Sequence, residues 1–204
     1  MIYVLPFLIG FLVAFIGLLA PAMLNMTTAR TSIEKGKKAG FQFAAGAASV
    51  VFIQGYIAVT FAKYLVANPE IIKKLNIAAV FVLFGLSIFF FIQARRKFEV
   101  TGKSKKGNNY LSGLLMSSLN MLAIPFYLAM ATLAESEGWM TNEKPYSIIF
   151  VVGAVLGSFF LFSVYAVFAK SIALKAAFIS RNINYILSVL FIGLAMFTLI
   201  KLLM

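Results

Sequence analysis

The stretch Gly17-Leu18-Leu19-Ala20-Pro21-Ala22-Met23-Leu24-Asn25-Met26 indicates the fold, because its order returns in the second half of the chain. There Gly113-Leu114-Leu115 is followed after three residues by Leu119-Asn120-Met121. Two later echoes keep the same order: Tyr56 to Lys63 returns as Tyr165 to Lys170, and Asn76, Gly85 and Phe89 return as Asn184, Gly193 and Phe197. Leu and Phe align in any apolar chain, so the recurring Asn, Gly, Tyr and Lys carry the argument. We therefore predict an internal repeat.

Composition places both halves in lipid. Apolar residues make up 62% of the chain and charged residues only 12%, with a mean hydropathy of +0.98, whereas charged residues are about a quarter of an ordinary soluble domain. Long uncharged stretches can each supply the roughly 20 residues of a membrane-crossing helix. We predict an all-α integral membrane protein with one transport domain, 1–204, and six transmembrane helices. Repeat one, 1–94, holds helices 2–29, 39–62 and 75–94; repeat two, 107–204, holds helices 110–134, 145–169 and 182–202.

Three crossings per half would turn the second repeat upside down relative to the first, as in many secondary transporters. The basic residues agree with this topology, because thirteen of the eighteen fall in predicted loops one, three and five. By the positive-inside rule these loops are cytoplasmic and both termini lie outside, in a multi-pass protein of the cytoplasmic (inner) membrane. This placement argues against nucleic acid as a partner. Membrane lipid is the expected partner, and the basic run from Arg95 to Lys106 would also suit anionic lipid headgroups.

The residues that the chain lacks exclude most chemistry. It has no Cys, His or Asp, and its six glutamates fall in predicted loops. Metal sites need clusters of thiolate, imidazole or carboxylate ligands, and covalent catalysis needs an activated nucleophile beside a base. We therefore expect no catalytic residues, no metal site and no cofactor.

Polar residues cluster beside helix breakers at two corresponding places. Proline removes a backbone donor and leaves main-chain groups that lipid cannot satisfy, and transporters bind substrates at such discontinuous helices. The alternative is an ordinary proline kink with satisfied polar neighbours. The candidate substrate-binding residues are Pro21, Asn25 and Thr28 in the first helix, and Ser117, Ser118, Asn120, Pro125 and Tyr127 in the fourth.

Small residues form a second paired feature. Gly46 lies in an alanine-rich stretch of the second predicted helix, and Gly153 and Gly157 form a small-xxx-small pattern in the fifth. Such residues let helix backbones approach closely in membranes. We interpret all three as helix-packing residues, with a sliding surface for alternating access as the alternative.

The chain resembles the lysine-exporter and homoserine/threonine-efflux (LysE/RhtB) family. The resemblance rests on Ala20-Pro21-Ala22, on Gly36-Lys37-Lys38-Ala39-Gly40 and on Gly46. Family members have a Pro-Gly-Pro element in helix one and an Asn-Pro-Lys element in helix four; here Asn120 matches the latter, and Met121 and Leu122 replace its Pro and Lys. The resemblance implies a secondary transporter that exports amino acids or similar small polar metabolites, driven by an ion gradient.

The absence of intramembrane acids narrows the expected solute. A lysine-like substrate would bring an extra cation into the membrane, where an unpaired charge is costly. We therefore expect a neutral zwitterionic amino acid or another small polar metabolite. Two alternatives remain open: a non-transporting membrane scaffold, and a carrier of metal or another small solute from the same superfamily. The sequence does not indicate the oligomeric state.

Overall fold

The computed structural model is helical throughout its described part, as expected for the all-α class. It describes residues 3–19, 22–68, 107–120 and 122–203, and positions 70, 71, 77, 80, 81, 84, 85, 87, 88, 91, 92, 94 and 95. The chain forms two compact units: Met1–Val66 with Val100–Leu174, and Ala67–Glu99 with Lys175–Met204. The first unit carries both sequence stretches that were expected to bind the solute.

The first predicted helix, 2–29, is two helices in the structure. Helix α1 (Val4–Gly17) ends before Pro21, and α2 (Met23–Lys35) begins after Ala22, whose backbone is extended with φ −108° and ψ 176°. Pro21 itself lies outside the described residues. A proline has no N–H to donate to the preceding turn and disfavours helical backbone in the residue before it. The second helix also runs past residue 29, because no Gly or Pro interrupts it before Gly36.

The fourth predicted helix, 110–134, is likewise two helices, α5 (Asn109–Ser118) and α6 (Ala123–Ser136), bent by 68°. The side chain of Asn108 caps α5 by accepting hydrogen bonds from the backbone N–H groups of Tyr110 and Leu111. Pro125 lies in the first turn of α6, where its missing N–H leaves no helical acceptor unsatisfied. The break therefore precedes the proline instead of following it.

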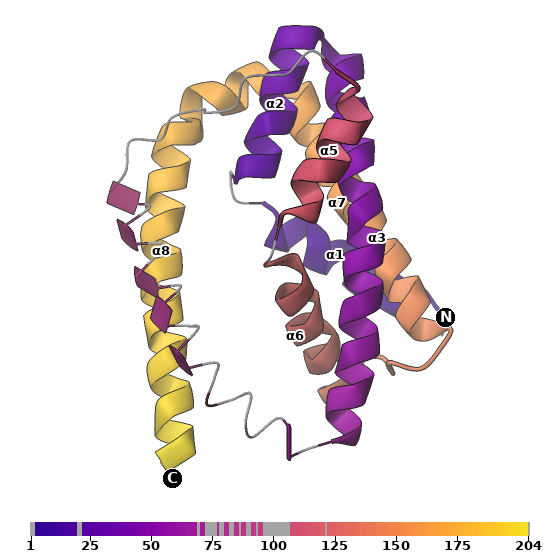
Figure 1. Cartoon of the computed structure of the whole chain (residues 1–204), viewed down its shortest axis with the longest axis vertical. Coiled ribbons are helices and arrows are strands. Elements are labelled where there is room, and N and C mark those ends of the chain that lie inside the picture. Colours follow the sequence, from indigo (N-terminus) through magenta and orange to yellow (C-terminus); the bar gives the residue numbers. More distant parts are fainter. Residues whose placement is uncertain are drawn as a thin grey trace. The chain divides into compact units, whose positions relative to one another are not determined.

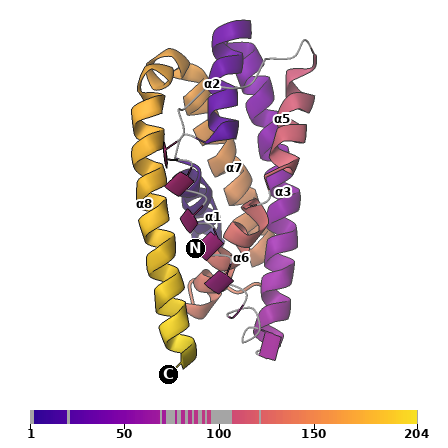
Figure 2. The same ribbon diagram turned by 60° about the vertical axis from the view of Figure 1, so that its left-hand side comes forward.

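Two long helices frame the broken ones. Helix α3 (Lys37–Ala67) and α7 (Tyr146–Val167) run in opposite directions along unit 1 (Figures 1 and 2). Gly36, with φ +89°, separates α2 from α3 in a conformation that L side chains rarely adopt. In the described part, α3 and α7 are long and apolar enough to cross a membrane, and the bent α5–α6 pair would be a third crossing.

The last predicted helix begins earlier than expected. Helix α8 (Ala169–Leu203) includes residues 170–181, which were predicted to form a loop because they are charged. Charge limits what can lie in lipid, but it does not end a helix, and this segment contains good helix formers such as Ala, Lys and Arg and lacks Gly and Pro. The predicted helix 75–94 lies only partly within the described residues.

Unit 2 contains a reciprocal contact. The hydroxyl of Ser87 donates to the carbonyl oxygen of Ser188 over 2.9 Å, and the hydroxyl of Ser188 donates to the carbonyl oxygen of Ser87 over 3.0 Å. Both serines are buried. Each segment thus gives its partner the same interaction that it receives, as two elements related by a two-fold axis would.

The core of unit 1 is built from small residues at helix contacts. One cluster joins alanines of four helices around the ring of Tyr127. Its buried members are Ala14 of α1, Val51 and Ala58 of α3, Ala123 and Tyr127 of α6, and Ala154 of α7. Because alanines bring backbones close together, α1 and α6, one helix from each broken pair, pack against α3 and α7 in this core.

Candidate functional site

The break between α1 and α2 leaves two carbonyl groups that other parts of unit 1 satisfy. The side-chain amide of Asn25 donates to the carbonyl oxygen of Leu18 over 2.5 Å. The hydroxyl of Tyr165, on α7, donates to the carbonyl oxygen of Leu19 over 2.8 Å, and Tyr165 also forms a side-chain hydrogen bond with Asn25. Asn25 is only 1% exposed. The polar ends of this break are therefore held inside the protein, as a lipid environment demands.

At the break between α5 and α6, the carbonyl oxygens of Ser117 and Asn120 accept hydrogen bonds from the backbone N–H groups of Asn120 and Ala123, over 3.0 and 3.2 Å, and a side chain adds to them. The amide of Gln54, on α3, donates to the carbonyl oxygen of Ser117 over 3.0 Å and lies 3.5 Å from that of Asn120. Gln54 is buried. Each break is thus capped from the long helix beside it: the first by α7 through Tyr165, and the second by α3 through Gln54.

The two breaks lie close together in unit 1. A Cβ atom on Gly17, at the end of α1, would overlap the ring of Phe126 in the first turns of α6. On the other side, Leu24 of α2 belongs to the same apolar cluster as Met116 of α5. The end of α1 therefore meets α6, and the end of α5 meets α2. Each broken pair contacts the other in the same way.

Helix α1 crosses α7 at unusually short range. A Cβ atom on Gly10 would overlap the carbonyl oxygen of Phe150 and lie 3.1 Å from the amide nitrogen of Ala154. In return, a Cβ atom on Gly153 would overlap the carbonyl oxygen of Phe7. Only glycine allows both backbones this approach, because any side chain would meet main-chain atoms that cannot move aside.

Helix α5 crosses α3 in the same way. A Cβ atom on Gly113 would overlap the carbonyl oxygen of Phe43 and lie 3.0 Å from the amide nitrogen of Ala47. In return, a Cβ atom on Gly46 would overlap the carbonyl oxygen of Tyr110. Gly46 and Gly153, both expected to serve helix packing, thus lie at the centres of two separate crossings.

The two crossings share one register. Each of the four glycines contacts two residues of the opposite helix. One of them lies three positions before the opposing glycine, and the other lies one position after it. The contacted pairs are Phe150 and Ala154 for Gly10, Phe7 and Phe11 for Gly153, Tyr110 and Leu114 for Gly46, and Phe43 and Ala47 for Gly113. Judged by these backbone contacts, Gly113 in the second half corresponds to Gly10 in the first half. The sequence repeat had matched Gly113 with Gly17 instead.

Two glutamates of unit 1 that were predicted to lie in loops are helical. Glu34 is in the last turn of α2, and Glu135 is in the last turn of α6. Glu34 pairs with Arg30 over 2.6 Å, whereas both carboxylate oxygens of Glu135 accept hydrogen bonds from Asn142. The loop assignment was wrong because both helices extend past the apolar stretches used to delimit them.

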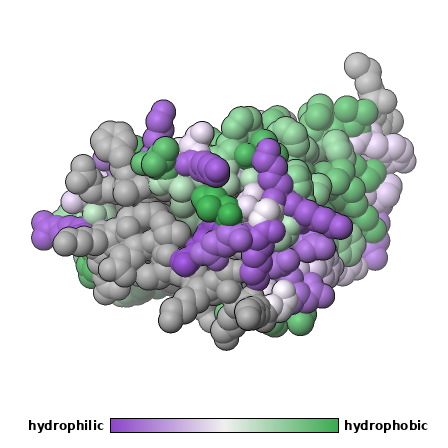
Figure 3. Space-filling view, turned by 90° about the horizontal axis from the view of Figure 1, so that it is seen from above, coloured by the Kyte–Doolittle hydropathy of each residue, from purple (hydrophilic) through white to green (hydrophobic). Residues whose placement is uncertain are grey.

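Polar groups gather at the end of unit 1 where α2 meets α3. Figure 3, which looks down on the upper end of Figure 1, shows a group of hydrophilic side chains there. Lys35 donates to the side chain of Asn109 over 3.2 Å, and Asn109 donates to Gln42 over 3.1 Å. The residues 34–38, including Lys37 and Lys38, are exposed. This is the end that the basic loops predict to be cytoplasmic.

The comparison with protein-family models gives one match over nearly the whole chain. Residues 15–202 match the model described as LysE type translocator. The chain belongs to this family. The resemblance predicted from residues 20–46 is thereby confirmed. No curated protein and no solved structure matches the chain significantly.

Membership makes this LysE-type translocator a membrane transporter of amino acids or similar solutes, in a family that transports and does not catalyse. Among the described residues, no group of three acidic, histidine or cysteine side chains could hold a metal ion.

The translocator's structure places the candidate residues in three environments. Asn25, Thr28, Ser117 and Tyr127 are buried, Asn120 is half-buried, and Ser118 and Pro125 are exposed. Thr28 and Ser118 donate to carbonyl groups of their own helices, and Tyr127 is hydrogen-bonded to Ser158 over 3.3 Å. The structure thus brings Asn25, Ser117 and Asn120 to the breaks and leaves Ser118 and Pro125 on the surface of the described unit.

Sequence reasoning did not select the two capping residues of the translocator. Gln54 on α3 and Tyr165 on α7 each donate from a long helix to a carbonyl group at a break. They could have been recognised as single polar side chains on apolar helices, at the same depth in the membrane as a break in another helix. That depth depends on how the helices cross, which the sequence does not state.

Proposed function

We propose that the protein is a secondary transporter that exports a small polar metabolite across the cytoplasmic membrane by alternating access between two inverted repeats. The observation that carries this proposal is the shared register of the two glycine crossings. Two helix pairs with unrelated side chains would not be expected to reproduce four backbone contacts at the same spacing. A repeated unit with a two-fold relation accounts for all four.

The directions of the helices support the inversion. In Figure 1, α1 and α2 lead toward the upper end of unit 1 and α3 leads away from it, whereas α5 and α6 lead away and α7 returns. Each broken pair followed by its long helix therefore repeats in the opposite sense, as in inverted-repeat transporters. Six crossings, with both termini outside and the basic loops in the cytoplasm, complete the proposed topology.

The proposed substrate site lies between the breaks, at Asn25, Ser117 and Asn120. In the present state protein donors hold the carbonyl oxygens of both breaks. We propose that a substrate ammonium group replaces some of these donors when the repeats rock apart, while its carboxylate meets the N-termini of α2 and α6, where a negative charge is favoured. Neither N-terminus has a side-chain cap.

A neutral zwitterion fits this site best. Of the described side chains at the breaks, the polar ones are amides and hydroxyls, which bind both charges of a zwitterion but cannot neutralise an extra cation. The remaining candidates, Pro21, Thr28, Ser118, Pro125 and Tyr127, would shape the breaks and not contact the solute directly.

Counterflow in liposomes tests the function. Purified protein is reconstituted with an unlabelled mixture of neutral amino acids inside, and uptake of each labelled amino acid is measured. Neutral amino acids should exchange faster than lysine or arginine, and a preference for the cationic pair would contradict the proposed substrate class. No exchange of any amino acid by folded protein would favour the non-transporting scaffold.

The double variant Asn25→Ala/Asn120→Ala tests the site. Exchange should fall by at least about tenfold, because two hydrogen-bonding side chains are lost from a buried site. Ser136→Ala is the matched control, since its exposed hydroxyl bonds within α6 to the carbonyl oxygen of Leu133 and lies outside the candidate site. Unchanged exchange in the double variant, with normal membrane insertion, would remove the site from this position.

A further inference from the structure

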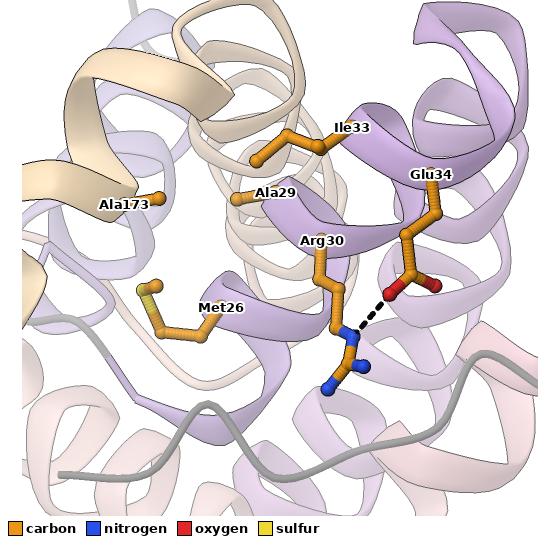
Figure 4. Close-up of a pocket in the computed structure, with 6 residues that line it drawn as sticks. All are labelled: Met26, Ala29, Arg30, Ile33, Glu34 and Ala173. Atoms are coloured by element: carbon orange, nitrogen blue, oxygen red, sulfur yellow. Dashed lines mark hydrogen bonds and ion pairs between the residues drawn. The ribbon is translucent and has the colours of Figure 1, made fainter.

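A separate cavity lies on the flank of α2, between that helix and the start of α8. It has a volume of about 290 Å³ and lies near the lower end of the range of roughly 300–1,000 Å³ for small-molecule sites, so it would take one small metabolite. Neither Asn25 nor Asn120 lines it. The lining residues, labelled in Figure 4, are Met26, Ala29, Arg30, Ile33, Glu34 and Ala173.

Among the described residues that line the cavity, one is positively charged, one is negatively charged and the others are apolar. The Nε of Arg30 donates to Oε1 of Glu34 over 2.6 Å (Figure 4). Their side chains are 26% and 37% exposed, so a solute can reach both. The remaining lining residues are aliphatic or, at Met26, a flexible thioether, and they offer no competing charge.

Helix stability does not explain this ion pair well. An anion in the last turn of a helix is disfavoured by the helix dipole, and a basic residue four positions before an acidic one is the weaker orientation of such a pair. Glu34 meets both conditions. The other broken pair also places an acid, Glu135, in the last turn of its second half-helix. Both halves thus keep a carboxylate where the helix itself would favour a base.

An ion pair of this kind can exchange partners with a zwitterion. The solute carboxylate can take the guanidinium of Arg30 in a charge-assisted, bidentate hydrogen bond, and the solute ammonium group can take the carboxylate of Glu34. Every charge remains paired throughout the exchange, so the step avoids the cost of an uncompensated charge. A solute that carries only one of the two charges could replace only one side of the Arg30–Glu34 pair.

We propose that this cavity is a docking site for an amino acid with both charges free and an aliphatic side chain. The carboxylate contacts Arg30, the ammonium group contacts Glu34, and the side chain lies against Met26, Ile33 and Ala173. This inference rests on the proposed function, because it supplies the site from which the solute passes along α2 toward Asn25. It adds a recognition step at the end of the protein that is predicted to be cytoplasmic.

Three forms of one solute test the docking site. Leucine carries both charges, leucinamide lacks the carboxylate, and N-acetylleucine lacks the ammonium group. Binding to purified protein in lipid nanodiscs is measured by calorimetry for the wild type, for Arg30→Gln and for Glu34→Gln. Lys63→Gln is the matched control, since Lys63 forms an exposed ion pair with Glu143 in the same unit and lines no part of the cavity.

The wild type should bind leucine about tenfold or more tightly than either derivative, which is the effect of one lost charged hydrogen bond. Arg30→Gln should abolish the preference for leucine over leucinamide alone, and Glu34→Gln should abolish the preference over N-acetylleucine alone. Arg30→Lys should restore most of the first preference, and Lys63→Gln should change neither.

Each remaining outcome contradicts a specific statement. If both variants weaken all three ligands equally, the ion pair is structural and the docking site is wrong. If leucine fails to bind the wild type while neutral amino acids still exchange in liposomes, the docking site is wrong and the proposed function stands. If the folded wild type neither binds nor exchanges any amino acid, the proposed function fails together with this inference.

Discussion

The crossing of α1 with α7 and the crossing of α3 with α5 share their glycine register but differ in what surrounds it. Beyond the shared contacts, the first crossing has a further close approach, where a Cβ atom on Gly157 would overlap the carbonyl oxygen of Phe11. Aromatic contacts extend it, with the ring of Phe160 centred 6.0 Å from that of Phe11 and 5.8 Å from that of Phe15. This crossing is held by apolar packing.

The crossing of α3 with α5 is flanked by polar contacts instead. The hydroxyls of Ser49 and Tyr110 lie 2.9 Å apart, and Asn109 donates to Gln42. Hydrogen bonds of this kind can be exchanged with water or a solute at small net cost, whereas close-packed backbones cannot separate without losing all their contacts. The comparison indicates that the shared glycines preserve the fold in both pairs, and that the α3–α5 pair is the one better suited to rearrange.

The largest expected effect comes from filling either glycine contact. Gly10→Leu and Gly46→Leu should both prevent stable folding, because the new side chain would meet main-chain atoms of the opposite helix. Fluorescence-detected size exclusion and thermal melting in detergent would measure this.

Gly193→Ala is the control, because a Cβ atom there would have no atom of the described residues within 4 Å. It should leave the melting temperature nearly unchanged. If Gly46→Leu folded as well as Gly193→Ala, the second crossing would not be equivalent to the first.

A smaller effect distinguishes the two breaks. Gln54→Leu should lower the free energy of unfolding by about 0.5–1.5 kcal/mol, since it removes a side-chain donor to the carbonyls of Ser117 and Asn120 and leaves them the backbone N–H groups of Asn120 and Ala123. Tyr165→Phe should cost less, because Asn25 still holds the neighbouring carbonyl of Leu18. Denaturation in mixed micelles would measure both. The reverse order of the two losses would show that the breaks are not supported as described.

The smallest expected effect tests whether the polar α3–α5 crossing and the apolar α1–α7 crossing respond differently to substitution. Tyr110→Phe removes an exposed hydroxyl and should change the free energy of unfolding by less than about 1 kcal/mol. If α3 and α5 rearrange in transport, the same variant should alter the exchange rate measured by counterflow. Phe160→Leu, on the apolar crossing, should lower the melting temperature and leave the exchange rate per folded protein unchanged. Equal effects on both quantities in the two variants would remove the distinction between the crossings.

The helical class, the membrane environment and the family could be predicted from the sequence, because they follow from composition and short motifs. Pro21 marked the first break, since proline interrupts a helix by its own chemistry. The register was missed, because Gly10 and Gly113 correspond through the backbones that they contact and not through their sequence neighbours. The start of α8 was missed because basic residues end an apolar stretch without ending a helix.

The site was only partly predictable. Asn25 and Asn120 were selected for their place beside prolines, and both do lie at the breaks. Gln54 and Tyr165 come from distant segments, so their role depends on how α3 and α7 cross the broken helices. Glu34 and Glu135 were assigned to loops because the apolar stretches were taken as the limits of the helices. These features arise from tertiary contacts, which local patterns do not encode.

The most direct test of the account asks whether the two halves are inverted. The natural chain has no cysteine, so single cysteines can be introduced without background at Lys37, on the α2–α3 junction, and at Trp139, on the α6–α7 junction; both positions are exposed. A membrane-impermeant maleimide should label the Trp139→Cys variant in intact cells and the Lys37→Cys variant only after permeabilisation. Labelling of both junctions from the same side of the membrane would contradict the inverted repeat.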